Sequence, residues 1–253
     1  MRKIVKKLSK ISLFMVVFVL FSNNILFAQY DNNSYYSESL LEELDEEYTD
    51  EDVIADPLEP FNRAMFYFND KLYFYLLKPV AQGYSFVVPE PIREHIDKAF
   101  YNARTPIRFV NDILQLKFDY AGRELGRFVV NSTVGLLGLF EPADKISFLE
   151  EPPPKDTDLT FGSWGIGHGV YIVWPLLGPN TIRSTVGLVG DSFLYPINYI
   201  DPWWVPLTIN STEHLNRMSL KIGEYEDLKE QSLDPYTALK QGYIDYREEQ
   251  LKK

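Results

Sequence analysis

The spacing of apolar positions along the chain predicts a protein built mainly from α-helices. From residue 56 onward, apolar side chains recur every three or four positions in most segments, which places them on one face of a helix. Prolines stand near several of the predicted starts, where a proline costs no helical hydrogen bond. We expect helices over residues 61–77, 92–103, 105–114, 119–130, 180–189, 210–229 and 236–251.

Capping residues mark three of these starts. Asp119 is expected to be an N-cap, because its carboxylate can accept a hydrogen bond from a free backbone N–H of the first turn. Asn210 with Glu213 three residues later has the pattern of a capping pair. Asp234-Pro235 has the pattern of an N-cap followed by a first-turn proline.

The predicted helix over residues 61–77 is unusual because its apolar side chains cover nearly the whole circumference. It contains neither proline nor glycine. A helix that is apolar on all sides is buried in a large core or contacts lipid. A chain of 253 residues is long enough to build such a core, so both interpretations remain open.

One short extended segment interrupts the helices. Residues 170–174 favour a strand, and Pro175 and Gly178-Pro179 end it. The pattern therefore predicts a single, mainly helical domain with at most one small β element.

The first 28 residues have the composition of a secretory signal peptide. Five basic residues precede an apolar run over residues 11–21, which is too short to span a hydrocarbon core of about 30 Å. We expect export and cleavage between Ala28 and Gln29, with Leu26 at a position where a small residue is preferred. The alternative is an uncleaved N-terminal anchor, which would also leave the rest of the chain outside the cytoplasm.

Residues 29–55 are expected to be a disordered acidic tether ahead of a folded body over residues 56–253. Residues 29–56 contain eleven acidic side chains and no lysine or arginine. Dense like charge with few apolar groups cannot offset the conformational entropy of the chain. No part of the body is broadly basic, which argues against nucleic-acid binding.

The chain lacks the residue patterns of most enzymes and metal sites. It has no cysteine, which excludes disulfides, thiolate nucleophiles and cysteine-held metal centres. His95, His168 and His214 are far apart in the sequence, and the glycines within 165–169 match no nucleotide-binding motif. A Ser-His-Asp triad assembles from distant segments and is not excluded in this way. We predict a protein that is not an enzyme and that uses no metal or cofactor.

Two apolar segments are candidates for contact with lipid. Val134–Phe140 carries no charge, and its glycines permit close approach of the backbone to acyl chains. A buried turn would explain the same composition. Trp203 and Trp204 have amphipathic rings that suit a headgroup interface, and core packing would explain this pair equally well.

Several short motifs stand in a characteristic order along the body of the chain. The first is Asp56-Pro57-Leu58-Glu59-Pro60-Phe61-Asn62-Arg63. The later ones are Lys78-Pro79-Val80-Ala81, Arg127-Phe128, Asn131-Ser132-Thr133-Val134-Gly135, Phe161-Gly162 with Gly165, Pro175-Leu176-Leu177-Gly178-Pro179-Asn180-Thr181-Ile182-Arg183 and Asp234-Pro235-Tyr236. In number and order, these motifs resemble the MlaA (VacJ) family of outer-membrane phospholipid-transport proteins over about residues 56–247.

The resemblance implies both a fold and a function. Members of the family are helical rings in the inner leaflet of the outer membrane, with an amphipathic central channel, and they associate with trimeric porins. By resemblance, this protein would remove phospholipid mislocalised to the outer leaflet and pass it to a soluble periplasmic carrier, which maintains lipid asymmetry. The channel residues that the resemblance implies are Phe68, Asn69, Val134, Gly135, Leu136, Leu137, Gly138, Leu139 and Phe140.

The chain departs from the family's pattern near its N-terminus. Members are usually acylated at a cysteine, and this chain has none. Attachment at the periplasmic face of the outer membrane would then depend on the ring's own apolar surface or on an uncleaved N-terminal segment. Two other functions remain open: a membrane-peripheral scaffold that binds a porin without moving lipid, and an envelope hydrolase.

Overall fold

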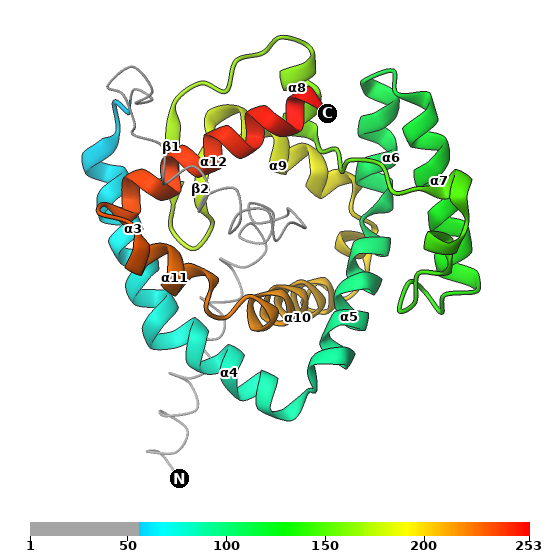
Figure 1. Cartoon of the computed structure of the whole chain (residues 1–253), viewed down its shortest axis with the longest axis horizontal. Coiled ribbons are helices and arrows are strands. Elements are labelled where there is room, and N and C mark those ends of the chain that lie inside the picture. Colours follow the sequence, from blue (N-terminus) through cyan, green and yellow to red (C-terminus); the bar gives the residue numbers. More distant parts are fainter. Residues whose placement is uncertain (1–55) are drawn as a thin grey trace.

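The computed structural model describes residues 56–253, so the predicted signal peptide (1–28) and acidic tether (29–55) lie outside the described residues. The described part is mainly helical and contains one small two-stranded sheet, as the sequence predicted. Figure 1 shows the helices following one another around a ring.

Helices and short helical turns make up most of the described chain, and the sheet lies between α8 and α9. In chain order, the elements are α3 (Glu59–Leu72), the π-helix η2 (Tyr73–Leu77), α4 (Lys78–Val87), α5 (Glu90–Ala103), α6 (Thr105–Leu114), α7 (Phe118–Thr133), the short 3₁₀ helices η3 (Pro142–Lys145) and η4 (Ser147–Leu149), α8 (Thr157–Ser163), β1 (Tyr171–Trp174), β2 (Gly178–Thr181), α9 (Ile182–Leu194), the 3₁₀ helix η5 (Pro196–Tyr199), α10 (Trp204–Leu220), α11 (Glu224–Gln231) and α12 (Pro235–Lys252).

Several helices begin where the sequence predicted. The carboxylate of Asp234 accepts a hydrogen bond from the N–H of Tyr236 at 3.2 Å and caps α12. Thr181 and Ser184 form a capping box at the start of α9. Pro106 lies in the first turn of α6, where its missing N–H leaves no gap in the helix.

The helix that is apolar on all sides is longer than predicted. The prediction ended at Leu77 ahead of Pro79, but the chain stays helical to Val87. The π-helical turn η2 separates α3 from α4, and Pro79 falls in the first turn of α4, where a proline is tolerated.

The predicted capping pair at Asn210 and Glu213 is wrong. α10 begins at Trp204, and both residues lie buried in its interior. The amide of Asn210 donates to Asn198 at 3.1 Å, and Glu213 accepts a hydrogen bond from Arg104 at 2.7 Å. Both polar side chains therefore serve tertiary contacts instead of a helix end.

Two other predicted helix limits differ from the structure. The helix predicted to reach residue 229 ends at Leu220, because Gly223 adopts a φ of 113° and separates α10 from α11. Asp119 is not the N-cap of α7, which begins one residue earlier. It lies in the first turn, where its charge suits the helix dipole, and it pairs with Arg123 at 2.6 Å.

The two-stranded sheet is antiparallel and is held by amide side chains of α3. The first residue of β1 lies opposite the last residue of β2. Asn62 accepts a hydrogen bond from the N–H of Val173 at 2.8 Å. Further along α3, Asn69 donates to the carbonyl of Trp174 at 2.9 Å and accepts from the N–H of Leu176 at 2.7 Å. The hairpin is thereby fixed to α3 at two points.

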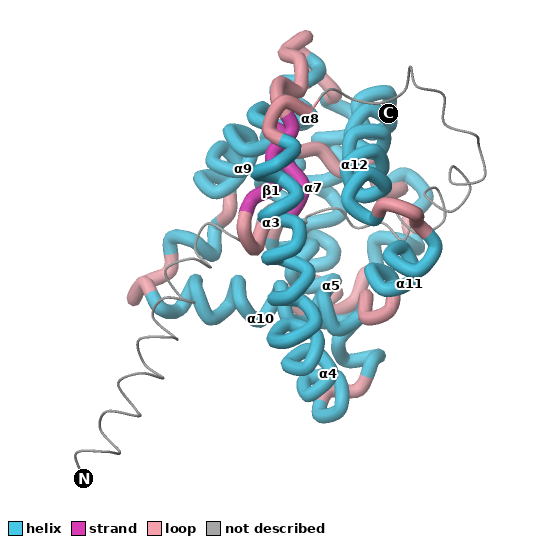
Figure 2. The backbone as a smooth tube through the Cα atoms, turned by 90° about the vertical axis from the view of Figure 1, so that its left-hand side faces the viewer, coloured by secondary structure: helices cyan, strands magenta, loops and turns pink. Residues whose placement is uncertain are grey.

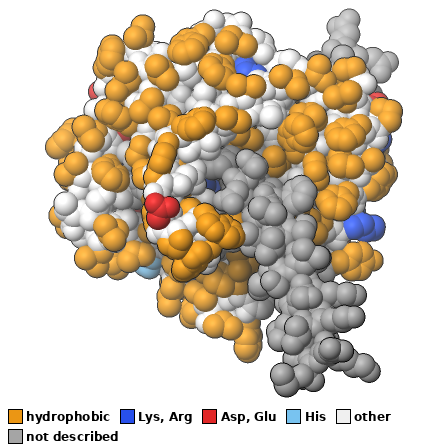
Figure 3. Space-filling model, turned by 180° about the vertical axis from the view of Figure 1, so that it is seen from behind, with side chains coloured by type: hydrophobic (Ala, Val, Ile, Leu, Met, Phe, Trp, Pro, Cys, Tyr) orange, Lys and Arg blue, Asp and Glu red, His pale blue; other side chains and the backbone are white. Residues whose placement is uncertain are grey.

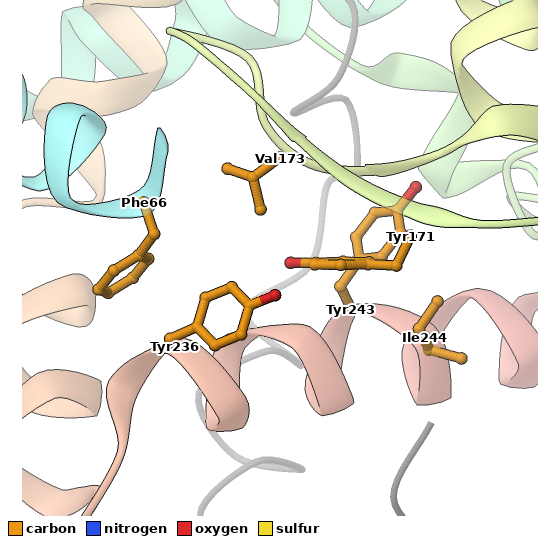
Figure 4. Close-up of a cluster of buried hydrophobic side chains, with 6 residues drawn as sticks. All are labelled: Phe66, Tyr171, Val173, Tyr236, Tyr243 and Ile244. Atoms are coloured by element: carbon orange, nitrogen blue, oxygen red, sulfur yellow. The ribbon is translucent and has the colours of Figure 1, made fainter. Parts of the chain in front are cut away.

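The main apolar cluster joins the two ends of the described chain. Figure 4 shows that its side chains come from α3, β1 and α12. The rings of Phe66 and Tyr236 meet edge to face with centroids 5.9 Å apart, and Tyr171 lies 6.3 Å from Tyr243. The cluster therefore closes the ring, and its members are Phe66, Tyr171, Val173, Tyr236, Tyr243 and Ile244.

Candidate functional site

The helix α9 presents its apolar side outward and its polar side inward. Ile182, Val186, Val189 and Phe193 are each between 47% and 68% exposed and follow one another along a single stripe. On the opposite side, α9 buries the three polar residues Arg183, Ser184 and Asp191. This is the reverse of a helix on the surface of a water-soluble protein.

The helix α7 repeats the same inverted arrangement. Phe118, Leu125 and Val129 are exposed, whereas Glu124 and Arg127 are buried. Among residues 56–253, the buried side chains are more often polar or charged than apolar. On both helices, polar and charged side chains therefore lie in the interior and apolar ones on the surface, which is rare in proteins that face only water.

Buried ion pairs hold this polar interior together. Arg104 lies 2.7 Å from Glu213, and Arg108 lies 2.9 Å from Glu124. Burial raises the pKa of Glu213, but the positive charges of Arg104 and Arg217 lower this pKa by a larger amount. The net shift of the pKa is therefore downward. The carboxylate therefore stays charged and paired inside the molecule.

One face of the ring is rich in apolar side chains. Figure 3 shows that this face carries mainly hydrophobic side chains, with few charged ones, and that it is hollowed near its middle. Figure 2 shows α9 and the start of α10 toward one side of the molecule, and α11 and α12 toward the other. The helix α9 therefore lies toward the face shown in Figure 3, and α12 lies toward the opposite face.

The segment Val134–Phe140 forms a tight left-handed turn after α7. Leu136 and Leu137 have φ angles of 53° and 63°, and Leu137 is 76% exposed. Left-handed leucines cost on the order of 1–2 kcal/mol each. The segment is thus not a buried turn: its backbone is held in a strained form that directs two leucines outward.

Contacts with α5 hold this turn in place. The carbonyl of Leu139 lies 2.8 Å from Nδ1 of His95, and the His95 ring packs against Phe140 at 4.8 Å. Gly138 has a φ of 91°, and a Cβ there would lie 2.4 Å from the Cβ of Asn102. Only glycine fits this position, which explains the close approach of the turn to α5.

Phe68 and Asn69 lie on α3, on the other side of the ring from α7 (Figure 1). Phe68 is exposed, whereas Asn69 is partly buried and uses its amide to hold the β-hairpin. The two parts of the predicted channel set are therefore not neighbours. If both parts line one passage, they do so from opposite sides of the ring. Their role in a passage stays a prediction.

Trp203 and Trp204 lie at the start of α10 and are 60% and 54% exposed. They are therefore not packed in the core. Tyr199 and Ile200, just before them, are exposed as well. The four residues extend the apolar surface of α9 along the chain.

The described residues form no cluster suited to hold a metal ion. No group of three or more His, Asp or Glu side chains between residues 56 and 253 is arranged to hold a metal ion. Over the same range, no helix has both the length and the hydropathy that crossing a membrane requires.

The outward stripes of α7 and α9 were missed in the sequence. Their spacing was visible, since apolar residues recur at positions i, i+7 and i+11 in both helices. Such a stripe is ordinarily assigned to the core, however, and the charged residues opposite it to the solvent. Only the tertiary contacts of those charged residues reveal that the two sides are exchanged.

Comparison with known proteins agrees with this geometry. The sequence profile of the family described as "MlaA lipoprotein" matches residues 54–250. The chain is 31% identical over 199 residues to the "Intermembrane phospholipid transport system lipoprotein MlaA" of Escherichia coli (strain K12), covering 78% of each chain. It is 30% identical over 191 residues to the protein of the same name from Haemophilus influenzae, covering 74% of this chain and 76% of that one.

Two further relatives extend the comparison. An uncharacterized protein of Rickettsia conorii is 30% identical over 200 residues, covering 77% of both chains. A solved structure described as "Structural basis for maintenance of bacterial outer membrane lipid asymmetry" aligns with a TM-score of 0.69 and 28% identity, and covers 78% of this chain and all of the other. A family match over most of the body, with the same mainly helical fold, leads to one conclusion: the chain belongs to the MlaA lipoprotein family.

Proposed function

We propose that this protein transports phospholipid at the outer membrane and so maintains its lipid asymmetry. In this proposal it removes phospholipid mislocalised to the outer leaflet through its ring and passes it to a soluble periplasmic carrier. The names of its relatives in E. coli and H. influenzae support the proposal, since both are intermembrane phospholipid transport lipoproteins.

The single observation that carries the proposal is the exchange of polar and apolar sides on α7 and α9. Apolar surface in water costs about 25 cal/mol for each Å² left exposed. The same surface costs nothing in a hydrocarbon layer. A ring that directs Val189 and Phe193 outward, with Arg183 and Asp191 inward, is therefore suited to lie in lipid on its apolar side.

A polar interior within that ring suits the chemistry of a lipid headgroup. Moving a bare headgroup through hydrocarbon costs several kcal/mol or more, because its charges lose their hydration. A passage with polar walls lowers that cost, while the acyl chains slide along apolar side chains. The hollow in the middle of the apolar face lies where such a passage would open (Figure 3).

The nine residues assigned to the passage remain part of the proposal. Phe68 and the outward leucines of Val134–Phe140 would contact acyl chains, and Asn69 would keep the wall rigid through the β-hairpin. Trp203 and Trp204 would lie at headgroup level at the periplasmic face of the membrane. A trimeric porin is the proposed neighbour in that membrane.

Deletion of the gene in the bacterium that encodes it tests the transport function. We expect more phospholipid in the outer leaflet, measured as reaction of intact cells with an amine-specific label that cannot cross the membrane. Restoring the wild-type chain should reverse the increase, whereas Val186→Glu combined with Val189→Glu should not. Leu233→Glu introduces an acid at an exposed apolar position between α11 and α12 and serves as the matched control.

The same experiment distinguishes a phospholipid transporter from a scaffold that binds a porin and moves no lipid. A scaffold that moves no lipid would leave the labelling of the deletion strain unchanged, provided that porin levels are also unchanged. That result would overturn the proposal. An increase in labelling that the control variant reverses, and that the double variant does not, would support it.

A further inference from the structure

A second site lies away from the middle of the ring, at the junction of α8, α9 and the C-terminal end of α12. It is a cavity of about 410 Å³. Its walls come from the glycine-containing segment after α8, from the start of α9 and from the last two turns of α12. The proposed phospholipid passage does not use this cavity.

Arg183 provides a cationic donor in the cavity wall. Its Nε donates to Asp158 at 2.6 Å and its Nη1 donates to the carbonyl of Ile166 at 2.8 Å. These two bonds fix the plane of the guanidinium. Within residues 56–253 its Nη2 makes no hydrogen bond, so two N–H donors of a rigidly held, largely buried arginine remain available to a ligand.

Two further groups with nitrogen atoms line the same cavity. His168 donates from Nδ1 to the carbonyl of Gly169 at 2.7 Å, which leaves Nε2 as the ring nitrogen without a bond in the described part of the chain. Lys252 is exposed, and its ammonium group forms no ion pair with any residue from 56 to 253. Three nitrogen-bearing side chains from three separate segments thus converge on one space.

The acidic residue in the wall does not repel an anion. Asp158 accepts hydrogen bonds from Arg183 at 2.6 Å and from Arg247 at 2.9 Å through its two oxygens. Burial raises its pKa, but Arg247 and Arg183 lower it more, so the net shift is downward and the carboxylate stays charged. Its charge is therefore compensated by two guanidinium groups.

Glu248 adds a negative charge to the cavity, opposite in sign to the charges of Arg183 and Lys252. It lines the cavity one helical turn before Lys252, is exposed, and has no ion-pair partner among residues 56–253. A simple anion would be repelled by this free carboxylate. In a ligand that carries both a phosphate and an amine, the phosphate would pair with Arg183 and Lys252, and the ammonium group would pair with Glu248.

The remaining wall is apolar and open. Ile166 is exposed, Ile244 is buried, and Leu251 packs close to Gly162. A Cβ added at Gly167 would contact nothing within 4 Å, so the rim on that side is unobstructed. A cavity of this size is typical of small-molecule sites, and it is too small for two full acyl chains.

We infer that this cavity binds the zwitterionic headgroup of a phospholipid that bears a phosphate and a primary amine. The phosphate is held by Arg183 and Lys252, the ammonium group by Glu248, and the first methylenes of the chains lie against Ile166 and Leu251. The inference rests on the polar groups of this cavity alone and does not require that lipid crosses the ring.

Binding of short-chain lipids to the full chain in a nonionic detergent tests this assignment. The probes are dihexanoyl phosphatidylethanolamine, dihexanoyl phosphatidylglycerol and inorganic phosphate. Each is titrated calorimetrically, and the two lipids are kept below their critical micelle concentrations. We expect the ethanolamine lipid to bind at least about tenfold more tightly than the glycerol lipid or phosphate, because only it satisfies both charges. Equal affinity for all three probes would overturn the assignment and identify a plain anion site.

Variants separate the two halves of the site. Glu248→Gln should weaken binding of the ethanolamine lipid about fivefold or more and leave binding of the glycerol lipid unchanged or tighter. Lys252→Ala should weaken binding of both lipids. Glu249→Gln and Lys253→Ala remove the neighbouring surface pair, which does not line the cavity, and should change neither affinity.

These variants avoid the buried pair between Arg183 and Asp158, so each is expected to fold. The site would be overturned if Glu248→Gln and Lys252→Ala both bound the ethanolamine lipid as tightly as the wild type does. Normal outer-leaflet labelling in cells that carry Glu248→Gln would leave the transport proposal standing while this binding is lost, so the two failures can be told apart.

Discussion

Arg63 Nη2 lies 2.7 Å from Oδ2 of Asp234, and Nη1 of the same guanidinium lies 3.2 Å from Oδ1. This two-point pair joins α3 to the N-cap of α12 across 171 positions of the chain. The guanidinium also lies 4.5 Å from the centre of the Tyr236 ring, and the Tyr236 hydroxyl bonds to Asp56. Two motifs from the two ends of the body therefore meet and close the ring.

Replacing Arg63 with Gln is expected to lower the free energy of unfolding by about 1 kcal/mol near neutral pH, because the pair is partly exposed to solvent. The hydrogen bond from Arg63 lowers the pKa of Asp234 to about 2, below its ordinary value of 3.8. A carboxyl with the lower pKa in the folded state stabilises the fold above about pH 4, and this contribution is lost as the pH falls toward 2.

Urea unfolding at pH 6 and pH 2.5 checks this prediction. The stabilities of the wild type and Arg63→Gln should differ at pH 6 and differ clearly less at pH 2.5. Glu59→Gln, which removes only the exposed helical pair with the same arginine, serves as the control and should change stability by no more than about 0.5 kcal/mol. A difference of equal size at both pH values would show that charge pairing is not the cause.

Replacing Asp112 with Asn is expected to stabilise the protein at pH 8 and to change it little at pH 4. Burial, and then the charge of Glu124, raise the pKa of Asp112 to about 7, and its Oδ1 has no hydrogen-bond partner in the described part of the chain. The folded state therefore holds the proton more tightly than the unfolded state, so stability is full below about pH 4 and is lost as the pH rises through 7.

Thermal or urea unfolding across pH 4–8 measures this effect. We expect the free energy of unfolding of Asp112→Asn to exceed that of the wild type by roughly 1–2 kcal/mol at pH 8. One pKa unit corresponds to about 1.4 kcal/mol, and part of the effect of the shift is screened by solvent. Asp119→Asn, at an exposed carboxylate of α7, is the control. A variant that is less stable than the wild type at pH 8 would indicate that the charge of Asp112 is required.

Replacing Val189 with Glu is expected to weaken membrane association about tenfold or more, because a charge at the middle of the outward stripe must leave water. Cosedimentation with phospholipid vesicles measures the bound fraction. Leu233→Glu, on the side of α11 and α12, should bind as the wild type does. Equal binding of both variants would exclude the α9 stripe as the membrane surface.

Replacing Gly138 with Ala is expected to destabilise the protein by about 2–4 kcal/mol. A Cβ at this position would lie 2.4 Å from Asn102, and the φ of 91° is unfavourable for any other residue. Gly83→Ala is the matched control, since a Cβ in that helical position contacts nothing within 4 Å and is expected to stabilise the helix by roughly 0.5–1 kcal/mol. Equal stabilities for the two variants would contradict the close packing of the turn on α5.

Local chemistry was sufficient to predict many of the elements. The starts of α12, α9 and α6 could be expected without tertiary information, because N-caps and first-turn prolines depend only on residues within one helical turn. These starts are marked by Asp234-Pro235, Thr181 and Thr105-Pro106. The β1 strand was also visible between its flanking turns. Its partner β2 was not, because Gly178 and Pro179 are typical strand breakers and become a strand only when α3 supplies bonds to the hairpin.

Long-range contacts decided the rest. Asn210 and Glu213 have the spacing of a capping pair, but their partners Asn198 and Arg104 come from other elements, and α10 runs through them. Asn69 was assigned to a passage by resemblance, and its amide proves to hold the β-hairpin. The cavity beside Arg183 combines side chains from three distant segments that no local pattern connects.

Helical spacing, capping residues and motif order were enough to establish a mainly helical chain of the MlaA family, because these features act over a few residues or in a fixed order. Which side of each helix faces inward could not be established in this way. An apolar stripe and a polar stripe are equally visible on a helix, and only the buried partners of Arg183, Glu124 and Arg104 show that the polar stripes form the interior. The tertiary structure decides that point because burying a charge is tolerated only where another chain segment supplies its counter-charge.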